Sequence, residues 1–227
     1  MKKQLFFLVA ILSLLSVTPA SAQRGRGGYG HSNSGYRYGG HSRHSYTPNM
    51  YGGLRFGLSA SHVNSDAPYL DGGNTQSGLN VGAVVGVQIA PSAPLFFESG
   101  LLYTEKGGKG SDHGDKFTFD LNYIEVPLVL KYSAYVAPAT AVEPYVGGYM
   151  ACGVGGKIKD FGQRAAYNSF SDGGFKRFDG GIRVGCGLAY EMLYAEIGYD
   201  FGLANIGDDA FNDTHNGAFF ANIGINF

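Results

Sequence analysis

The chain has 227 residues and a formal net charge of −1, and only 15% of its residues are charged, where a typical globular chain has roughly 25%. It carries 37 glycines, 16 tyrosines and 16 phenylalanines, a composition that suits strands whose side chains fit a curved wall. Apart from the N-terminal apolar stretch, which is itself too short, no run approaches the ~20 apolar residues of a transmembrane helix. The composition therefore excludes a helical membrane protein, and any membrane insertion must use strands.

The first 22 residues have the three parts of a secretory signal peptide. Lys2 and Lys3 supply the charged start, residues 5–17 the apolar stretch, and residues 20–22 (Ala-Ser-Ala) the cleavage site. We expect the mature protein to begin at Gln23.

Residues 23–48 form a low-complexity segment of Gly, Arg, His, Ser and Tyr with four arginines and no acidic residue. Such a segment cannot bury enough apolar surface to offset the entropy lost on ordering, so we expect a disordered periplasmic arm. We favour a flexible linker that contacts anionic cell-wall or lipid groups. The alternatives are a metal site at His31, His41 and His44 and nucleic-acid contacts, which a periplasmic location disfavours.

From residue 51 onward, eight segments alternate with a period of two, which predicts strands with two different faces. One face carries no Asp, Glu, Lys or Arg over its central length, and the strand charges lie on the other face or near strand ends. The predicted strands are 54–61, 79–89, 95–104, 123–132, 145–154, 178–190, 195–203 and 219–227.

The last strand ends on Phe227, as expected of a transmembrane barrel whose final strand pairs with its first. The connections alternate in length, with short links at 91–94, 134–143 and 191–193 and long ones at 63–77, 107–118, 157–174 and 205–216. Short periplasmic turns and long external loops are typical of outer-membrane barrels. We therefore predict an all-β fold, an eight-stranded antiparallel up-and-down transmembrane β-barrel over residues 49–227, with both termini in the periplasm.

The polar face decides between a membrane barrel and a soluble lipid-binding barrel of the lipocalin type, in which the polarity is inverted. A soluble exterior needs ~25–35% charged residues, whereas this face offers Gly, Asn, Ser and a few charges of both signs. We place those charges in a narrow lumen as ion-pair candidates: Arg55, Glu98, Glu125, Lys131, Arg183, Glu196 and Asp200.

Four residues carry local expectations. Pro127 falls in mid-strand, where it removes a ladder donor, so we expect a bulge or an unpaired position beside Glu125. Glu125 is interpreted as part of a structural ion pair, with a proton or ion relay as the alternative. Cys152 and Cys186 fall on the apolar face of neighbouring strands, which predicts free, lipid-facing thiols, with a cross-strand disulfide as the alternative.

The fourth strand, residues 123–132 (YIEVPLVLKY), resembles a hallmark of the PorT-like outer-membrane β-barrel family of Bacteroidetes. Residues 179–190 and 98–103 resemble further patterns of that family. The resemblance covers residues ~50–227 and implies an eight-stranded barrel in the outer membrane, without enzymatic residues. The member that gave the family its name is linked to protein secretion, a link that does not carry over residue by residue.

We therefore expect a small outer-membrane protein with a side-chain-filled lumen and a structural or interaction role in the cell envelope. An accessory role in secretion is one form of the expected interaction role. The alternatives are a narrow ion or solute conduit and the soluble lipid-binding barrel. His62, His113 and His215 lie in or near external loops, but nothing arranges them as a base beside a nucleophile. We expect no enzyme, cofactor, metal or nucleic-acid partner. The expected partners are outer-membrane lipids, the barrel assembly machinery through the C-terminal strand, and envelope proteins through the external loops.

Overall fold

The computed structural model describes residues 49–65, 74–112, 115–160, 166–170, 175–207 and 213–227. The expected signal peptide at 1–22 and the expected arm at 23–48 lie outside these residues. In the described part, no helix is long and apolar enough to cross a membrane.

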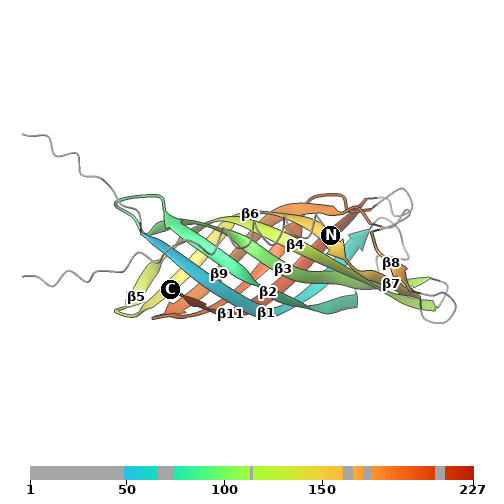
Figure 1. The fold of residues 1–227 in the computed structure, drawn as a ribbon, viewed down its shortest axis with the longest axis horizontal. Coiled ribbons are helices and arrows are strands. Elements are labelled where there is room, and N and C mark those ends of the chain that lie inside the picture. The colour runs from blue at the N-terminus through green and yellow to red at the C-terminus, as the bar shows by residue number, and fades with distance from the viewer. Residues whose placement is uncertain (1–48, 66–73, 113–114, 161–165, 171–174, 208–212) are drawn as a thin grey trace, which may run out of the picture. The chain divides into compact units, whose positions relative to one another are not determined.

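Eight long strands form a closed antiparallel wall in which each strand pairs with its neighbours in sequence (Figure 1). They are β1 (Met50–Ser65), β2 (Asn74–Gln88), β3 (Leu95–Asp112), β4 (Asp115–Tyr132), β6 (Thr140–Gly155), β9 (Phe178–Tyr190), β10 (Leu193–Gly202) and β11 (Thr214–Asn226). Three short strands extend the wall at its ends: β5 (Ala134–Ala137), β7 (Lys157–Asp160) and β8 (Tyr167–Asn168). The predicted all-β, eight-stranded barrel is confirmed.

The first and last strands close the wall. Their register runs without a shift from Gly53↔Asn226 to Ser65↔Thr214. Beyond it, the main chains of Gly52 and Phe227 exchange two hydrogen bonds of 2.9 and 2.8 Å. No backbone edge is left open along this seam, as a barrel in hydrocarbon requires.

The two faces of the wall have opposite polarity, as predicted. The side chains of Leu58 and Ile223 point outward and are 63% and 65% exposed, whereas Arg55 and Glu125 point inward and are 2% and 0% exposed. Apolar residues therefore cover the exterior and charged residues lie in the lumen. This arrangement is the reverse of a soluble lipid-binding barrel, so that alternative is wrong.

Several connections are shorter than predicted. The expected loop at 107–118 is wrong, because β3 continues to Asp112 and β4 begins at Asp115 in one long hairpin. Gly107 and Gly108 conceal the alternation in the sequence. The next inward side chains of β4, Phe119 and Leu121, are nevertheless buried.

Strands also enter the other expected connections. The segment at 134–143 holds β5 and the start of β6, and 157–174 holds β7 and β8. The strands β1, β2 and β11 extend into the expected loops at 63–77 and 205–216.

Pro127 produces an unpaired position without a bulge. The β3–β4 ladder is interrupted between Ser99↔Leu128 and Leu102↔Glu125, yet its register is unchanged. On the opposite side, Pro127 pairs in regular register with Tyr149 of β6.

Both cysteines are free and exposed on the outer face. Cys152 is opposite Phe178 and Cys186 is opposite Pro144 in the same β6–β9 ladder. The two thiols are therefore separated by eight ladder positions, roughly 26 Å at ~3.3 Å per residue. A disulfide needs Cα atoms within about 7 Å, so this geometry excludes a cross-strand bridge.

The polarity of the wall can be tested by placing a cation on its outer face. We expect Leu58→Arg to lower the free energy of unfolding in lipid vesicles by ~2–4 kcal/mol, the cost of an arginine near the bilayer midplane. Asn64→Arg, on an exposed position of the same strand close to its loop end, is the matched control and should change it by less than about 0.5 kcal/mol. Urea titration measures both, and equal effects would contradict the assignment of the outer face.

Candidate functional site in the barrel lumen

The inward side chains concentrate the buried charges of the described residues into two groups. One lies toward the end of the barrel that carries the short turns, and we name it the turn-side cluster: Arg55, Glu98, Lys131 and Glu143. The other lies toward the end with the longer connections, and we name it the loop-side cluster: Lys106, Glu125, Asp179, Arg183 and Asp200. Both draw their members from several strands.

The turn-side cluster is centred on Lys131 and Glu98. Lys131 Nζ lies 2.8 Å from Glu98 Oε2 and 3.8 Å from Glu143 Oε2, and it donates to Tyr194 Oη at 2.8 Å. Arg55 Nη2 lies 3.4 Å from Glu98 Oε2. Two cations thus face two carboxylates, and the formal charge of the cluster is zero.

Neutral partners complete this cluster. The Tyr51 hydroxyl donates to Glu98 Oε2 at 2.6 Å, and the Ser133 hydroxyl donates to Glu143 Oε1 at 2.6 Å. The Arg55 guanidinium lies 3.9 Å from the centre of the Tyr194 ring, within the range of a cation–π contact. These groups fix both carboxylates in place.

The loop-side cluster surrounds a fully buried ammonium group. Lys106 Nζ lies 2.9 Å from Glu125 Oε2, 3.4 Å from Asp200 Oδ2 and 3.7 Å from Asp179 Oδ2. Arg183 donates to both oxygens of Asp200, at 2.7 and 2.8 Å, and to Glu125 Oε1. Two cations therefore hold three carboxylates in an interior where an unpaired charge is costly.

The third carboxylate is also stabilised by neutral donors. Asn216 Nδ2 donates to Asp179 Oδ2 at 2.9 Å, and the Tyr149 hydroxyl donates to Asp179 Oδ1 at 3.3 Å. The ammonium of Lys106 lies 4.2 Å from the centre of the Tyr149 ring. Side chains of β3, β4, β6, β9, β10 and β11 thus meet at this one level of the lumen.

Apolar side chains separate the clusters and cover the loop-side one. Val129, Tyr145 and Phe220 pack together, at inward positions that fall between the two clusters along β4, β6 and β11; we name them the apolar layer. Beyond the loop-side cluster lies a larger apolar group, which we name the apolar cap: Val63, Phe119, Leu121, Tyr123, Tyr149, Ala151, Ile158, Phe170, Phe175 and Ile206. Side chains therefore occupy the lumen at four successive levels.

Inward aromatic rings lie over inward glycines on neighbouring strands. A Cβ added to Gly187 would lie 2.1 Å from Tyr194 Oη, and one added to Gly185 would lie 2.3 Å from Tyr145 Oη. The Phe220 ring covers Gly198 in the same way. This close approach, which has been used to protect glycines in designed sheets, explains why glycine and aromatic residues are abundant together.

The structure places six of the seven predicted lumen residues in the two clusters. Arg55, Glu98 and Lys131 belong to the turn-side cluster, and Glu125, Arg183 and Asp200 belong to the loop-side cluster. Glu196 is half-buried and accepts a hydrogen bond from Asn222 Nδ2 at 2.9 Å.

Three charged members were not predicted as site residues. Lys106 continues the series of inward residues that includes Glu98, Gly100 and Thr104, at every second position of β3. It was missed because the predicted third strand ended at residue 104. Glu143 fell within a predicted turn, although it is an inward residue of β6. Asp179 was on the polar face of its predicted strand, and only the structure shows that it lies 3.7 Å from Lys106.

The histidines of the enzyme alternative lie apart from both clusters. His62 Nε2 is 3.4 Å from the Tyr199 hydroxyl, and His215 Nδ1 is 3.1 Å from the main-chain oxygen of Ala204. His113 lies outside the described residues.

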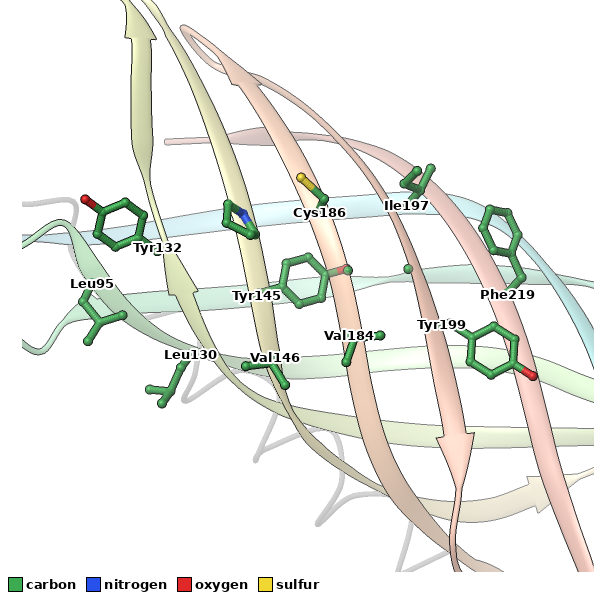
Figure 2. Close-up of a pocket in the computed structure, with 13 residues that line it drawn as sticks. Leu95, Leu130, Tyr132, Tyr145, Val146, Val184, Cys186, Ile197, Tyr199 and Phe219 are labelled. Carbon is green, nitrogen blue, oxygen red and sulfur yellow. The ribbon is translucent and has the colours of Figure 1, made fainter.

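A shallow groove of about 870 Å³ lies on the outside of the wall, over β6, β9 and β10 (Figure 2). Gly185 and Gly198 contribute to it where the wall carries no side chain. Its main apolar border consists of Leu95, Leu130, Val146, Val184, Cys186, Ile197 and Phe219. The groove is therefore part of the apolar exterior, and its chemistry suits hydrocarbon chains.

The energetic role of the loop-side cluster can be tested with a double-mutant cycle. We expect Lys106→Met to lower the free energy of unfolding by ~3–5 kcal/mol, because it leaves buried carboxylates without their cation. Adding Glu125→Gln should recover ~1 kcal/mol or more, since the double variant removes a positive and a negative charge together. Urea titration in detergent micelles measures the cycle, and strictly additive losses would show that the two groups do not interact.

No curated protein matches the sequence. Similar solved structures are surface protein A of Neisseria (14% identity, covering 80% of this chain and 100% of that chain, TM-score 0.49), OprG of Pseudomonas aeruginosa (14%, 79% and 97%, 0.45) and Ail of Yersinia pestis (15%, 78% and 99%, 0.41).

The family comparison rests on the sequence of the barrel itself. The family model described as "Outer membrane protein beta-barrel domain" matches residues 50–208. This range includes all the long strands except β11. The chain therefore belongs to the outer membrane protein β-barrel domain family and is a small barrel protein of the outer membrane.

Proposed function

We propose that this protein is a non-conducting barrel that serves a structural or interaction role in the cell envelope. The observation that carries the proposal is the filling of the lumen: Lys106, Glu125 and Lys131 are at most 1% exposed, and apolar groups lie between and above the two ionic clusters. An eight-stranded barrel has an interior that side chains just fill. The barrel then acts as a rigid membrane anchor for the segments at its two ends.

The features that a partner would contact lie at the two ends of the wall. On the loop side, the β3–β4 hairpin extends through paired residues to Asp112↔Asp115, and Lys109 is an exposed residue of that hairpin. We propose envelope proteins as partners at this end, lipids around the wall, and the barrel assembly machinery at β11. We propose no catalytic activity, and a membership of the PorT-like family with an accessory role in secretion stays a prediction from the sequence.

A narrow conduit is the second candidate. The observation that favours it is that some buried polar atoms of the lumen, such as Arg55 Nε and Asn80 Oδ1, have no hydrogen-bond partner among the described residues. Buried water commonly satisfies such atoms. A file of water through the lumen would, however, have to pass the apolar layer.

Single-channel recording in planar bilayers separates the two candidates. We expect the native protein to give no sustained current, because the apolar layer interrupts any aqueous path. A variant with Val129→Gly, Tyr145→Ala and Phe220→Ala empties this layer alone, and it should also give no sustained current because the apolar cap still covers the loop-side cluster. Migration of both proteins on unheated gels shows whether each barrel is folded. Sustained unitary current from the folded native protein would overturn the non-conducting proposal.

Site-specific photo-crosslinking in intact cells tests the interaction role. A photoreactive residue at Lys109 should capture a defined envelope protein, since this position is exposed beyond the apolar exterior. The same residue at Ile223, on the outer face of the wall, is the matched control and should react with lipid alone. If Lys109 also yields only lipid or water adducts, the proposed partner at the loop end is wrong.

A further inference from the structure

One strand of the wall is displaced toward the lumen near the loop end. The β2–β3 ladder breaks between Thr75↔Gly108 and Asn80↔Thr104, and its register shifts there. The Ser59 hydroxyl of β1 donates to the main-chain oxygen of Glu105 at 2.7 Å. Because β1 and β3 are separated by β2 in the sheet, this contact shows that β3 passes on the inner side of β2.

The serine contact identifies this close passage, whereas Gly78 of β2 does not distinguish it. A Cβ added to Gly78 would lie 2.1 Å from the main-chain oxygen of Glu105, the distance also found for glycines of regular ladders such as Gly57 and Gly147. The Ser61 hydroxyl makes a second contact of the same kind, donating to the oxygen of Gly107 at 3.0 Å. Two hydroxyl groups of β1 thus hold the displaced segment of β3 from the lumen side.

The displacement leaves a polar hollow of about 540 Å³ in the wall, which we name the rim niche. Strands β2, β3 and β4 and the segment around β7 and β8 line it, and the residues used below are Gln76, Glu105, Asp120, Asn122, Lys157 and Asn168. Glu105 follows the outward residue Tyr103 by two positions, and Asn122 precedes the outward residue Ile124 by two. The rim niche therefore opens on the outer side of the barrel.

The two carboxylates of the rim niche are held in place by neighbouring groups. Glu105 Oε2 accepts a hydrogen bond from the Leu79 main-chain N–H at 3.1 Å, and Oε1 accepts one from the Tyr103 hydroxyl at 3.2 Å. Asp120 accepts a hydrogen bond from Gln76 Nε2 and lies 3.1 Å from Lys159 Nζ. Since an ionised carboxylate has about four acceptor positions, each of them can accept further bonds.

The chemistry of the rim niche fits hydroxyl groups better than phosphate. Carboxylates accept hydrogen bonds, lysine donates them, and the carboxamides of Asn122 and Asn168 do both. A sugar hydroxyl also donates and accepts, so it matches a mixed lining of this kind. Glu105 and Asp120 share the lining with Lys157 and with Lys106, whose ammonium is paired in the loop-side cluster, and Lys159 lies beside Asp120. A phosphate would therefore have to approach two carboxylates.

The rim niche lies directly beyond the apolar exterior of the barrel. The residues that precede it on the outer face include Tyr103, Ile124 and Val154, the last of which is exposed. We propose that the rim niche binds the sugar headgroup of a glycolipid in the outer leaflet, whose acyl chains lie along this apolar surface. This proposal does not depend on the role proposed for the barrel as a whole.

Nuclear magnetic resonance of the isotope-labelled full chain, folded in lauryldimethylamine oxide micelles, tests the proposal. Dodecyl maltoside is the glycolipid probe, maltose tests the sugar alone, and dodecylphosphocholine tests the phosphate. We expect saturable shifts of the Gln76, Asn122 and Asn168 side-chain amides with dodecyl maltoside. Maltose should bind on the order of tenfold more weakly or not at all, because it lacks the chain, and dodecylphosphocholine should give no saturable shift.

A matched pair of variants locates the site. Asn122→Leu should weaken dodecyl maltoside binding about tenfold, the effect of losing hydrogen bonds to the ligand. Asn64→Leu, an exposed asparagine of β1 outside the rim niche, should leave binding unchanged. Equal binding of maltose would overturn the lipid source, equal binding of dodecylphosphocholine would overturn the sugar headgroup, and the absence of saturable shifts would overturn the site itself.

Discussion

Closure of an eight-stranded sheet is the constraint on which the rest of this structure depends. In hydrocarbon every backbone polar group must be satisfied within the sheet, and pairing of β11 with β1 achieves this along the seam. Closure with only eight strands leaves an interior about one layer of side chains wide. Any charge that points inward is therefore withdrawn from bulk water, and it must meet its partner within the lumen.

The lumen solves the resulting packing problem in two ways. Charges are gathered where carboxylates from several strands surround a single ammonium, as Glu125, Asp179 and Asp200 surround Lys106. Elsewhere, large rings are accommodated because the facing position on a neighbouring strand is glycine, as at Tyr194 and Gly187. Ion pairs connect neighbouring strands, as Arg183 of β9 and Asp200 of β10, and also strands that are not neighbours, as Lys106 of β3 and Asp200. Ring–glycine contacts connect neighbouring strands.

The alternation of side chains was sufficient to predict the wall, its polarity and six of the charges that form ion pairs in it. The alternation was insufficient where glycines occupy consecutive positions, because a residue without a side chain marks neither face. At Gly107 and Gly108 the sequence looks like a loop, although the hairpin continues. It also could not show which charges meet, because a period of two assigns a residue to a face but not to a height. Asp179 was recognised as inward, yet its place beside Lys106 follows from the tilt and register of β3 and β9. The displacement of β3 had no local signal in the sequence, where Gly78 is one glycine among 37.

The displacement of β3 links the lumen to the outer surface. Where Glu105 and Gly107 are held by the serines of β1, the intervening residue, Lys106, is carried toward the centre of the loop-side cluster, which explains how one ammonium comes within 3.7 Å of three carboxylates. The same movement leaves the space on the outer side that becomes the rim niche. The burial of Lys106 and the hollow beside Glu105 are therefore two consequences of a single irregularity in the ladder. The ion pairs of Lys106 and the two serine hydrogen bonds therefore act on the same segment of β3 that borders the rim niche.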